Sequence, residues 1–172
     1  VLFADIRGFT QLSESLSPEE VVGLLNAYFE RMIEVIVRNH GTLNKFLGDG
    51  LMAIFGAPKD DPYQEKNAVQ AAIEMLAELE KLQEQWGREG RTPIRIGIGI
   101  NSGSAIIGNV GSSQRMEYTA IGDTVNLASR LEGATKELAV DVLVSEYTFD
   151  AVRGVFRMRE MGAIKVKGRT AP

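Results

Sequence analysis

The sequence predicts an α+β fold in which long helices pack on one face of a mostly antiparallel sheet. Two observations support this prediction. Apolar residues recur at helical spacing over two long stretches, and short apolar runs divided by glycine-containing turns flank those stretches. The resulting order of strand, helix, hairpin, helix and hairpin is that of a split βαβ, or ferredoxin-like, core with additions at its C-terminal end.

The expected elements follow from start, stop and turn signals. Ser17-Pro18 with Glu20 supplies a cap, a first-turn proline and a glutamate at the third helical position, so a helix begins there. Gly48-Asp49-Gly50 can adopt the positive φ of a hairpin turn between two apolar runs. We expect strand 1–6, helix 18–41, strands 42–47 and 51–55, helix 61–87, strands 95–100 and 105–110 joined by a turn at 101–104, helix 123–136, and strands and a short helix over 141–145, 155–161 and 163–167.

Length and composition exclude several classes of function. The 172 residues are 44% hydrophobic and carry a net charge of −4, which suits one globular domain and argues against a nucleic-acid or anionic-membrane surface. Cysteine is absent, and the single histidine, His40, reads as a helix terminus. Any metal must therefore be held by oxygen ligands, which favours Mg²⁺, Mn²⁺ or Ca²⁺.

The chain has the pattern of a domain taken from a longer protein. No run approaches the roughly 18 apolar residues that a membrane span needs. The chain begins without methionine inside an apolar run that reads as a strand. We therefore expect residues 1–172 to form one cytoplasmic domain without direct membrane contact, joined in the full protein to an upstream sensory or regulatory domain.

Two aspartates occupy positions where they can act together. Asp5 lies in the first apolar strand and Asp49 at the tip of the hairpin, and the split βαβ topology makes these elements central neighbours. Two convergent carboxylates suit a pair of Mg²⁺ ions for phosphoryl chemistry. Each residue also has an ordinary alternative role, Asp49 in a turn and Asp5 as a helix cap.

One glycine turn and several polar side chains are candidates for binding a phosphorylated ligand. Gly8 follows the first strand, where backbone N–H groups can hold phosphate oxygens. Asn126 and Arg130 lie four residues apart on one face of a predicted helix, where an arginine can neutralise phosphate; a solvated polar face is the alternative. Lys45 lies in an otherwise apolar strand, so it either reaches solvent or meets a ligand, and Lys167 is a cation near the chain end.

Four segments together carry a stronger signal than any single residue: 3–10 (FADIRGFT), 45–49 (KFLGD), 122–130 (GDTVNLASR) and 166–168 (VKG). In this order and spacing they resemble the class III adenylyl and guanylyl cyclase homology domain over nearly the whole chain. The resemblance implies an adenylate cyclase that converts ATP to 3′,5′-cyclic AMP and pyrophosphate, with two Mg²⁺ or Mn²⁺ ions in each active site.

The resemblance also implies residue roles. Asp5, Asp49 and the Ile6 carbonyl would bind the metals, and the Gly8-Phe9-Thr10 turn and Lys167 would bind the phosphates. Lys45 and Thr119 would select adenine, Lys45 by donating to N1 and Thr119 by accepting from the exocyclic amine. Asn126 would orient the ribose and Arg130 would stabilise the α-phosphate. The family divides these groups between two subunits, so the chain is expected to act as a homodimer with two shared sites.

Three alternatives stay open at this point. A guanylyl cyclase would favour glutamate rather than lysine at position 45. A diguanylate cyclase, whose fold is related, would need a Gly-Gly-Asp/Glu-Glu-Phe hairpin, whereas residues 47–51 read LGDGL. A catalytically silent, cyclase-like dimerisation or regulatory module would be expected to lack one of the metal-binding aspartates, the asparagine or the arginine, and none of these is missing.

Overall fold

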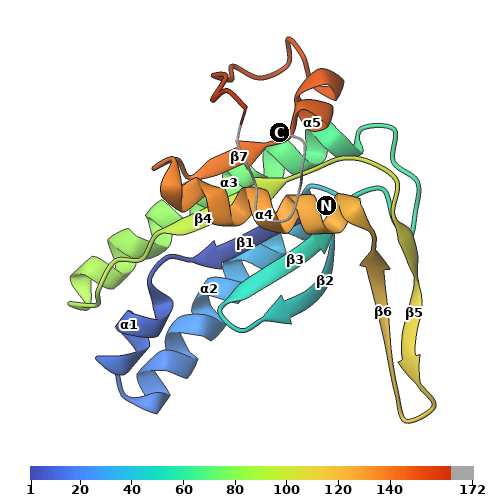
Figure 1. Ribbon diagram of the computed structural model, residues 1–172. Coiled ribbons are helices and arrows are strands. Elements are labelled where there is room, and N and C mark those ends of the chain that lie inside the picture. Colours follow the sequence, from blue (N-terminus) through green and yellow to red (C-terminus); the bar gives the residue numbers. More distant parts are fainter. Residues whose placement is uncertain (164–172) are drawn as a thin grey trace.

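A five-stranded sheet forms the centre of the protein, in a computed structural model that describes residues 1–163. Its strands are β1 (Leu2–Ile6), β2 (Thr42–Leu47), β3 (Gly50–Ile54), β4 (Ile96–Ile100) and β7 (Val142–Val144), in the order β2-β3-β1-β4-β7 (Figure 1). β1 pairs antiparallel with β3 and β4, and only β7 runs parallel to its neighbour. The predicted α+β fold with a mostly antiparallel sheet is confirmed.

The two long helices cover one face of this sheet. α2 (Pro18–Arg38) begins with the predicted capping box at Ser17 and Glu20, and α3 (Gln64–Arg88) packs beside it (Figure 1). The main core holds alternate residues of β1 and β4 together with the apolar stripes of both helices. These members include Leu2, Ala4, Ile6, Tyr28, Met32, Met75, Trp86, Ile96, Ile98 and Ile100.

Another helix, α4 (Asp123–Glu137), packs closely on β4. It can do so because β4 has two glycines, Gly97 and Gly99, on the face that α4 covers. A Cβ added at Gly99 would lie 2.1 Å from the backbone nitrogen of Glu132, and one at Gly97 would lie 2.9 Å from Glu132 Oε1. The alternation of isoleucine and glycine in β4 therefore gives the strand one apolar face for the main core and one flat face for α4. This close approach fixes the residues of α4 relative to the end of β1.

The second predicted hairpin is wrong. β5 (Ile106–Ser112) does not pair with β4; it pairs with β6 (Arg115–Ile121) in a separate two-stranded ribbon that projects from the sheet (Figure 1). The edge of β4 that a hairpin would use is occupied by β7 instead. Polar and charged residues are mixed through β6, so its sequence lacks the apolar run by which the other strands were predicted.

Two further differences concern short segments. Residues 9–14 form a separate helix, α1 (Phe9–Glu14), which was not predicted. Residues 155–161 were expected in a strand, but they form a turn and irregular backbone after α5 (Glu146–Ala151). Phe156 and Met158 pack against the main core from this irregular segment, so their burial explains the apolar pattern without a strand. The expected element at 163–167 lies almost wholly outside the described residues.

Candidate active site

The carboxyl groups of Asp5 and Asp49 lie together at one end of the sheet. Ala4 of β1 pairs with Leu51 of β3, which places Asp5 beside Gly50, and a Cβ added at Gly50 would lie 2.8 Å from Asp5 Oδ1. Asp49 precedes Gly50 in the hairpin turn, and the side chains of Asp5 and Asp49 are within hydrogen-bonding contact. The lack of a side chain at position 50 leaves room for the two carboxyl groups to meet.

Burial and this contact together make the ionised form of Asp5 unfavourable in the metal-free protein. Burial first, and then the negative charge of Asp49, raise the pKa of Asp5 to about 7, against a hydrogen bond from the backbone of Ile6 that lowers it. Two close carboxylates with excess negative charge are a donor set suited to a divalent cation that prefers oxygen ligands. Within residues 1–163, no group of three or more histidine, aspartate or glutamate side chains is placed to hold a metal ion, so the candidate metal site is this pair of carboxyl groups.

Glu132 is a third acidic group near the pair, and sequence reasoning did not identify it. It is half-buried, its charge adds to the rise in the pKa of Asp5, and its own pKa is raised by burial. Arg7 opposes this rise through its positive charge. The signal was present in the sequence, because Glu132 lies four residues after Ala128 and therefore on the face of α4 that packs against the sheet.

The connection from β1 to α1 is a tight turn beside Asp5. Gly8 has a φ of +68°, a left-handed conformation that a residue with a side chain adopts only with strain. Phe9 and Thr10 form the first turn of α1. Arg7 donates to the backbone oxygen of Val140 and pairs with Asp141 at 3.4 Å, which ties this turn to the segment before β7.

Lys45 and Thr119 lie at one junction between β2 and β6. Lys45 Nζ is 2.9 Å from Glu117 Oε2, and the Thr119 hydroxyl donates to Asn44 Oδ1 at 3.0 Å. Asn44 Nδ2 in turn donates to the backbone oxygen of Tyr118 at 2.9 Å. These contacts join the ribbon to the edge strand of the sheet and bring two residues together that are far apart in the sequence.

Asn126 and Arg130 lie on the outer side of α4. Asn126 is exposed and Arg130 half-buried, whereas Leu127, Ala128 and Leu131 face inward. Within the described part of the chain, neither polar side chain makes a hydrogen bond or an ion pair. Arg130 precedes Glu132 by two positions, which is a rotation of about 200° around the helix. It therefore points away from Asp5 and Asp49 of its own chain. Lys167 lies outside the described residues.

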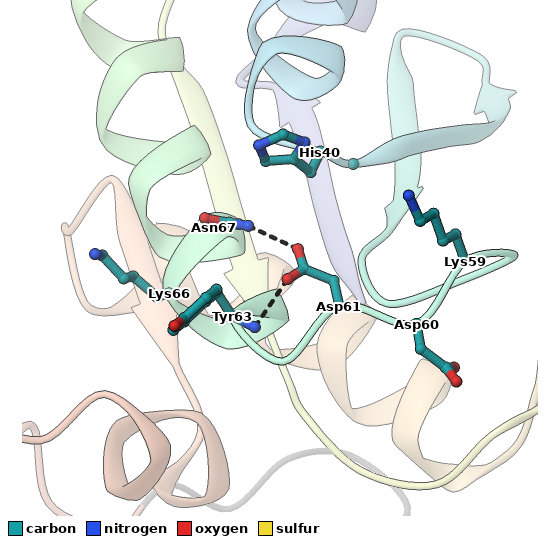
Figure 2. Close-up of a pocket in the computed structure, with 8 residues that line it drawn as sticks. His40, Lys59, Asp60, Asp61, Tyr63, Lys66 and Asn67 are labelled. Atoms are coloured by element: carbon teal, nitrogen blue, oxygen red, sulfur yellow. Dashed lines mark hydrogen bonds between the residues drawn. The ribbon is translucent and has the colours of Figure 1, made fainter.

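A cavity of about 460 Å³ lies elsewhere, where α2 ends and α3 begins (Figure 2). Asp61 accepts hydrogen bonds from the Tyr63 backbone N–H at 2.9 Å and from Asn67 Nδ2 at 2.7 Å, which holds the first turn of α3. His40, which follows the cap of α2 with a φ of +62°, also lines the cavity. None of the residues predicted to bind nucleotide or metal lines it, so the cavity is separate from the candidate active site.

Comparison with known proteins identifies the family. The family model for the adenylate and guanylate cyclase catalytic domain matches residues 1–172. Adenylate cyclase 1 of Rhizobium meliloti (strain 1021) is 38% identical to this chain over 98% of the chain's length. The matched region is only 25% of the length of that protein. The chain therefore belongs to the adenylate and guanylate cyclase catalytic domain family.

Solved structures of this family have the same fold. The crystal structure of the adenylyl cyclase CyaB from P. aeruginosa superposes with a TM-score of 0.93 at 40% identity, covering 99% of this chain and 88% of that one. The guanylyl cyclase Cya2 superposes with a TM-score of 0.90 at 36% identity, covering 98% of this chain and 84% of that one. None of the helices within residues 1–163 is both long enough and apolar enough to cross a membrane.

Proposed function

We propose that this domain converts ATP to 3′,5′-cyclic AMP and pyrophosphate at sites shared between two copies of the chain. The observation that carries the proposal is the contact between the Asp5 and Asp49 carboxyl groups at the end of β1. Two carboxylates in contact, with a third acid nearby, favour a divalent cation as their partner. This arrangement supports an active enzyme over a silent module, because a module without catalysis has no need for an unfavourable pair of charges.

The two aspartates and the Ile6 carbonyl would hold two Mg²⁺ or Mn²⁺ ions, which supply Lewis-acid activation of the ribose 3′-hydroxyl and neutralise the triphosphate. The protein contributes position and charge. Asn126 orients the ribose so that the 3′-oxygen faces the α-phosphorus, and the Gly8-Phe9-Thr10 turn and Lys167 bind the phosphates. Arg130 donates to the α-phosphate oxygens, on which negative charge grows as the new bond forms and pyrophosphate leaves.

The choice of ATP over GTP depends on two side chains. The overall fold does not distinguish the two substrates, because an adenylyl cyclase and a guanylyl cyclase both superpose closely on this chain. Lys45 is a donor that matches adenine N1, and the Thr119 hydroxyl is an acceptor that matches the exocyclic amine. Guanine has the opposite pattern at both atoms, so the pair favours ATP.

The geometry of α4 supports a shared site. Glu132 faces the sheet near Asp5, whereas Arg130 lies about 200° further around the helix. One ATP molecule can therefore meet the aspartates of one chain and the Arg130 of a second chain. Because every chain carries both sets of residues, a symmetric pair of chains would hold two equivalent sites.

Cyclic nucleotide production by the purified protein tests this proposal. The assay compares ATP with GTP, and Mg²⁺ with Mn²⁺, over a range of protein concentrations. We expect cyclic AMP from ATP, with a specific activity that rises with protein concentration because the active species is a dimer. Production of cyclic GMP alone would overturn the substrate assignment. If the specific activity does not change with protein concentration, even at concentrations well below the dimer dissociation constant, the shared site is wrong.

A further inference from the structure

The Asn44 side chain is held in one orientation by its two hydrogen bonds. Its Nδ2 lies 2.9 Å from the backbone oxygen of Tyr118, and its Oδ1 lies 3.0 Å from the Thr119 hydroxyl. A backbone oxygen can only accept, so the amide nitrogen must face Tyr118. The reverse orientation would place two acceptors in contact at Tyr118, which is unfavourable.

The orientation of Asn44 in turn determines the direction of the Thr119 hydroxyl. An amide oxygen can only accept, so the single hydrogen of the hydroxyl is committed to Asn44 Oδ1. The Thr119 oxygen then has only lone pairs left for a ligand. Thr119 is 8% exposed, so water cannot readily replace Asn44 as the partner of this hydrogen.

We propose that Asn44 is a specificity-determining positioning residue: it fixes the Thr119 hydroxyl as an acceptor and thereby favours adenine over guanine. The inference rests on the proposed function, in which Thr119 faces the purine. The exocyclic amine of adenine donates to Thr119, whereas guanine presents its O6 acceptor at the same position. With Asn44 in place, guanine leaves two acceptors facing each other and one buried hydrogen bond unmade.

The geometry predicts that the effect of Asn44 passes through one atom, the Thr119 hydroxyl oxygen. Without an acceptor at position 44, the hydroxyl can rotate and donate to guanine O6. A carboxylate at position 44 also accepts only, so aspartate preserves the direction of the hydroxyl, although it replaces the hydrogen bond to the Tyr118 backbone oxygen by a contact between two acceptors. Asn44→Asp is therefore a matched control for Asn44→Leu, because only the leucine variant frees the hydroxyl.

The test measures kcat/KM for ATP and for GTP in the purified wild-type protein, Asn44→Leu, Asn44→Asp, Thr119→Val and the Asn44→Leu/Thr119→Val double variant. We expect the ATP/GTP ratio to fall on the order of tenfold in Asn44→Leu and to stay within about threefold of wild type in Asn44→Asp. In the Thr119→Val background, the leucine substitution should leave the ratio unchanged, because no hydroxyl remains to be directed.

A structural brace would give a different pattern. If Asn44→Leu lowers both activities equally, or shifts the ratio just as much in the Thr119→Val background, Asn44 does not act through the hydroxyl and the inference is wrong. Circular dichroism and thermal unfolding show whether each variant folds. If Asn44→Leu does not fold, Asn44→Ala takes its place in the same test. A wild-type protein that prefers GTP would overturn the proposed function itself. A wild-type preference for ATP that Asn44→Leu leaves intact would overturn only the role of Asn44.

Discussion

The ammonium group of Lys45 lies 2.9 Å from Oε2 of Glu117, so the residue proposed to read adenine N1 already has a carboxylate partner in its own chain. The other oxygen of Glu117, Oε1, lies 2.9 Å from Arg115. The hydrogen bond from Lys45, followed by its charge, lowers the pKa of Glu117, which keeps this carboxylate ionised near neutral pH. Lys45 retains donors for a ligand, because an ammonium group has three.

Glu117→Gln should weaken ATP binding more than it slows catalysis. The substitution keeps the shape of the side chain but removes the charge that positions the ammonium group. The side chains of Lys45 and Glu117 are 28% and 45% exposed, so solvent screens the pair and its contribution is small. We therefore expect KM for ATP to rise about two- to fivefold with kcat little changed. Steady-state kinetics measure this, with Arg115→Gln as the control; a fall in KM would mean that Glu117 competes with ATP for Lys45.

Removal of the Asp5 charge should affect metal binding and stability in opposite directions. Above the Asp5 pKa of about 7, the ionised Asp5 is repelled by the negative charge of Asp49, so Asp5→Asn should raise the melting temperature in EDTA at these pH values. Addition of Mn²⁺ should stabilise the wild-type protein, since a ligand that binds the folded state shifts the folding equilibrium, but should have little effect on Asp5→Asn. Thermal unfolding with and without Mn²⁺ checks both statements. A metal-induced stabilisation of equal size in the two proteins would place the cation elsewhere.

Arg130→Ala should lower kcat on the order of 10²-fold while changing KM much less, because its charge meets charge that develops in the transition state. Arg130→Ala and Asp5→Ala should each have only a small residual activity alone. When mixed they should regain part of the activity, since one of the two sites in a mixed dimer keeps both groups. Lys136→Ala, on the same helix, is the control for the loss of a positive charge. A mixture with no more activity than its components would argue against shared sites.

The packing of α4 on β4 gives a prediction about stability. At Gly99, a new methyl group would meet the backbone of Glu132 and Ala128, which cannot move without displacing the helix. We expect Gly99→Ala to cost about 1–3 kcal/mol of the free energy of unfolding and to reduce activity with it. Gly133→Ala adds the same group in open space on α4 and should be neutral or stabilise by about 0.5–1 kcal/mol. Chemical denaturation of both variants measures the difference; equal effects would contradict the close approach.

The topology of the core and the position of the two aspartates could be predicted because each rests on a local signal. The capping box at Ser17, the turn at Asp49 and the apolar strands are all visible in short windows of sequence. The ribbon could not be predicted, because the pairing of β6 with β5 and the parallel addition of β7 depend on contacts between distant segments. Asn44 and Glu117 could not be identified for the same reason, because their hydrogen bonds to Thr119 and Lys45 form only where β2 and β6 meet.

Glu74 links the stability of the helical layer to pH. It lies on α3 and accepts hydrogen bonds from Gln70, from Asn39 at the end of α2, and from Arg38, and these bonds lower its pKa. A carboxyl group whose pKa is lower in the folded state stabilises the protein above its unfolded pKa and loses that contribution as the pH falls through its folded pKa.

Glu74→Gln should therefore destabilise the protein by about 1 kcal/mol at neutral pH and progressively less as the pH falls below about 4. The comparison requires denaturant unfolding of the wild type and the variant at several pH values, all in EDTA so that metal binding does not contribute. Glu78→Gln, one turn further along α3, tests specificity, because Glu78 bonds only to Lys81 of its own helix within the described residues. That variant should lose less stability at neutral pH, since its ion pair is local and exposed. If the difference in the free energy of unfolding between the wild type and Glu74→Gln stays unchanged at low pH, the hydrogen bonds of Glu74 to α2 do not depend on the charge of its carboxylate.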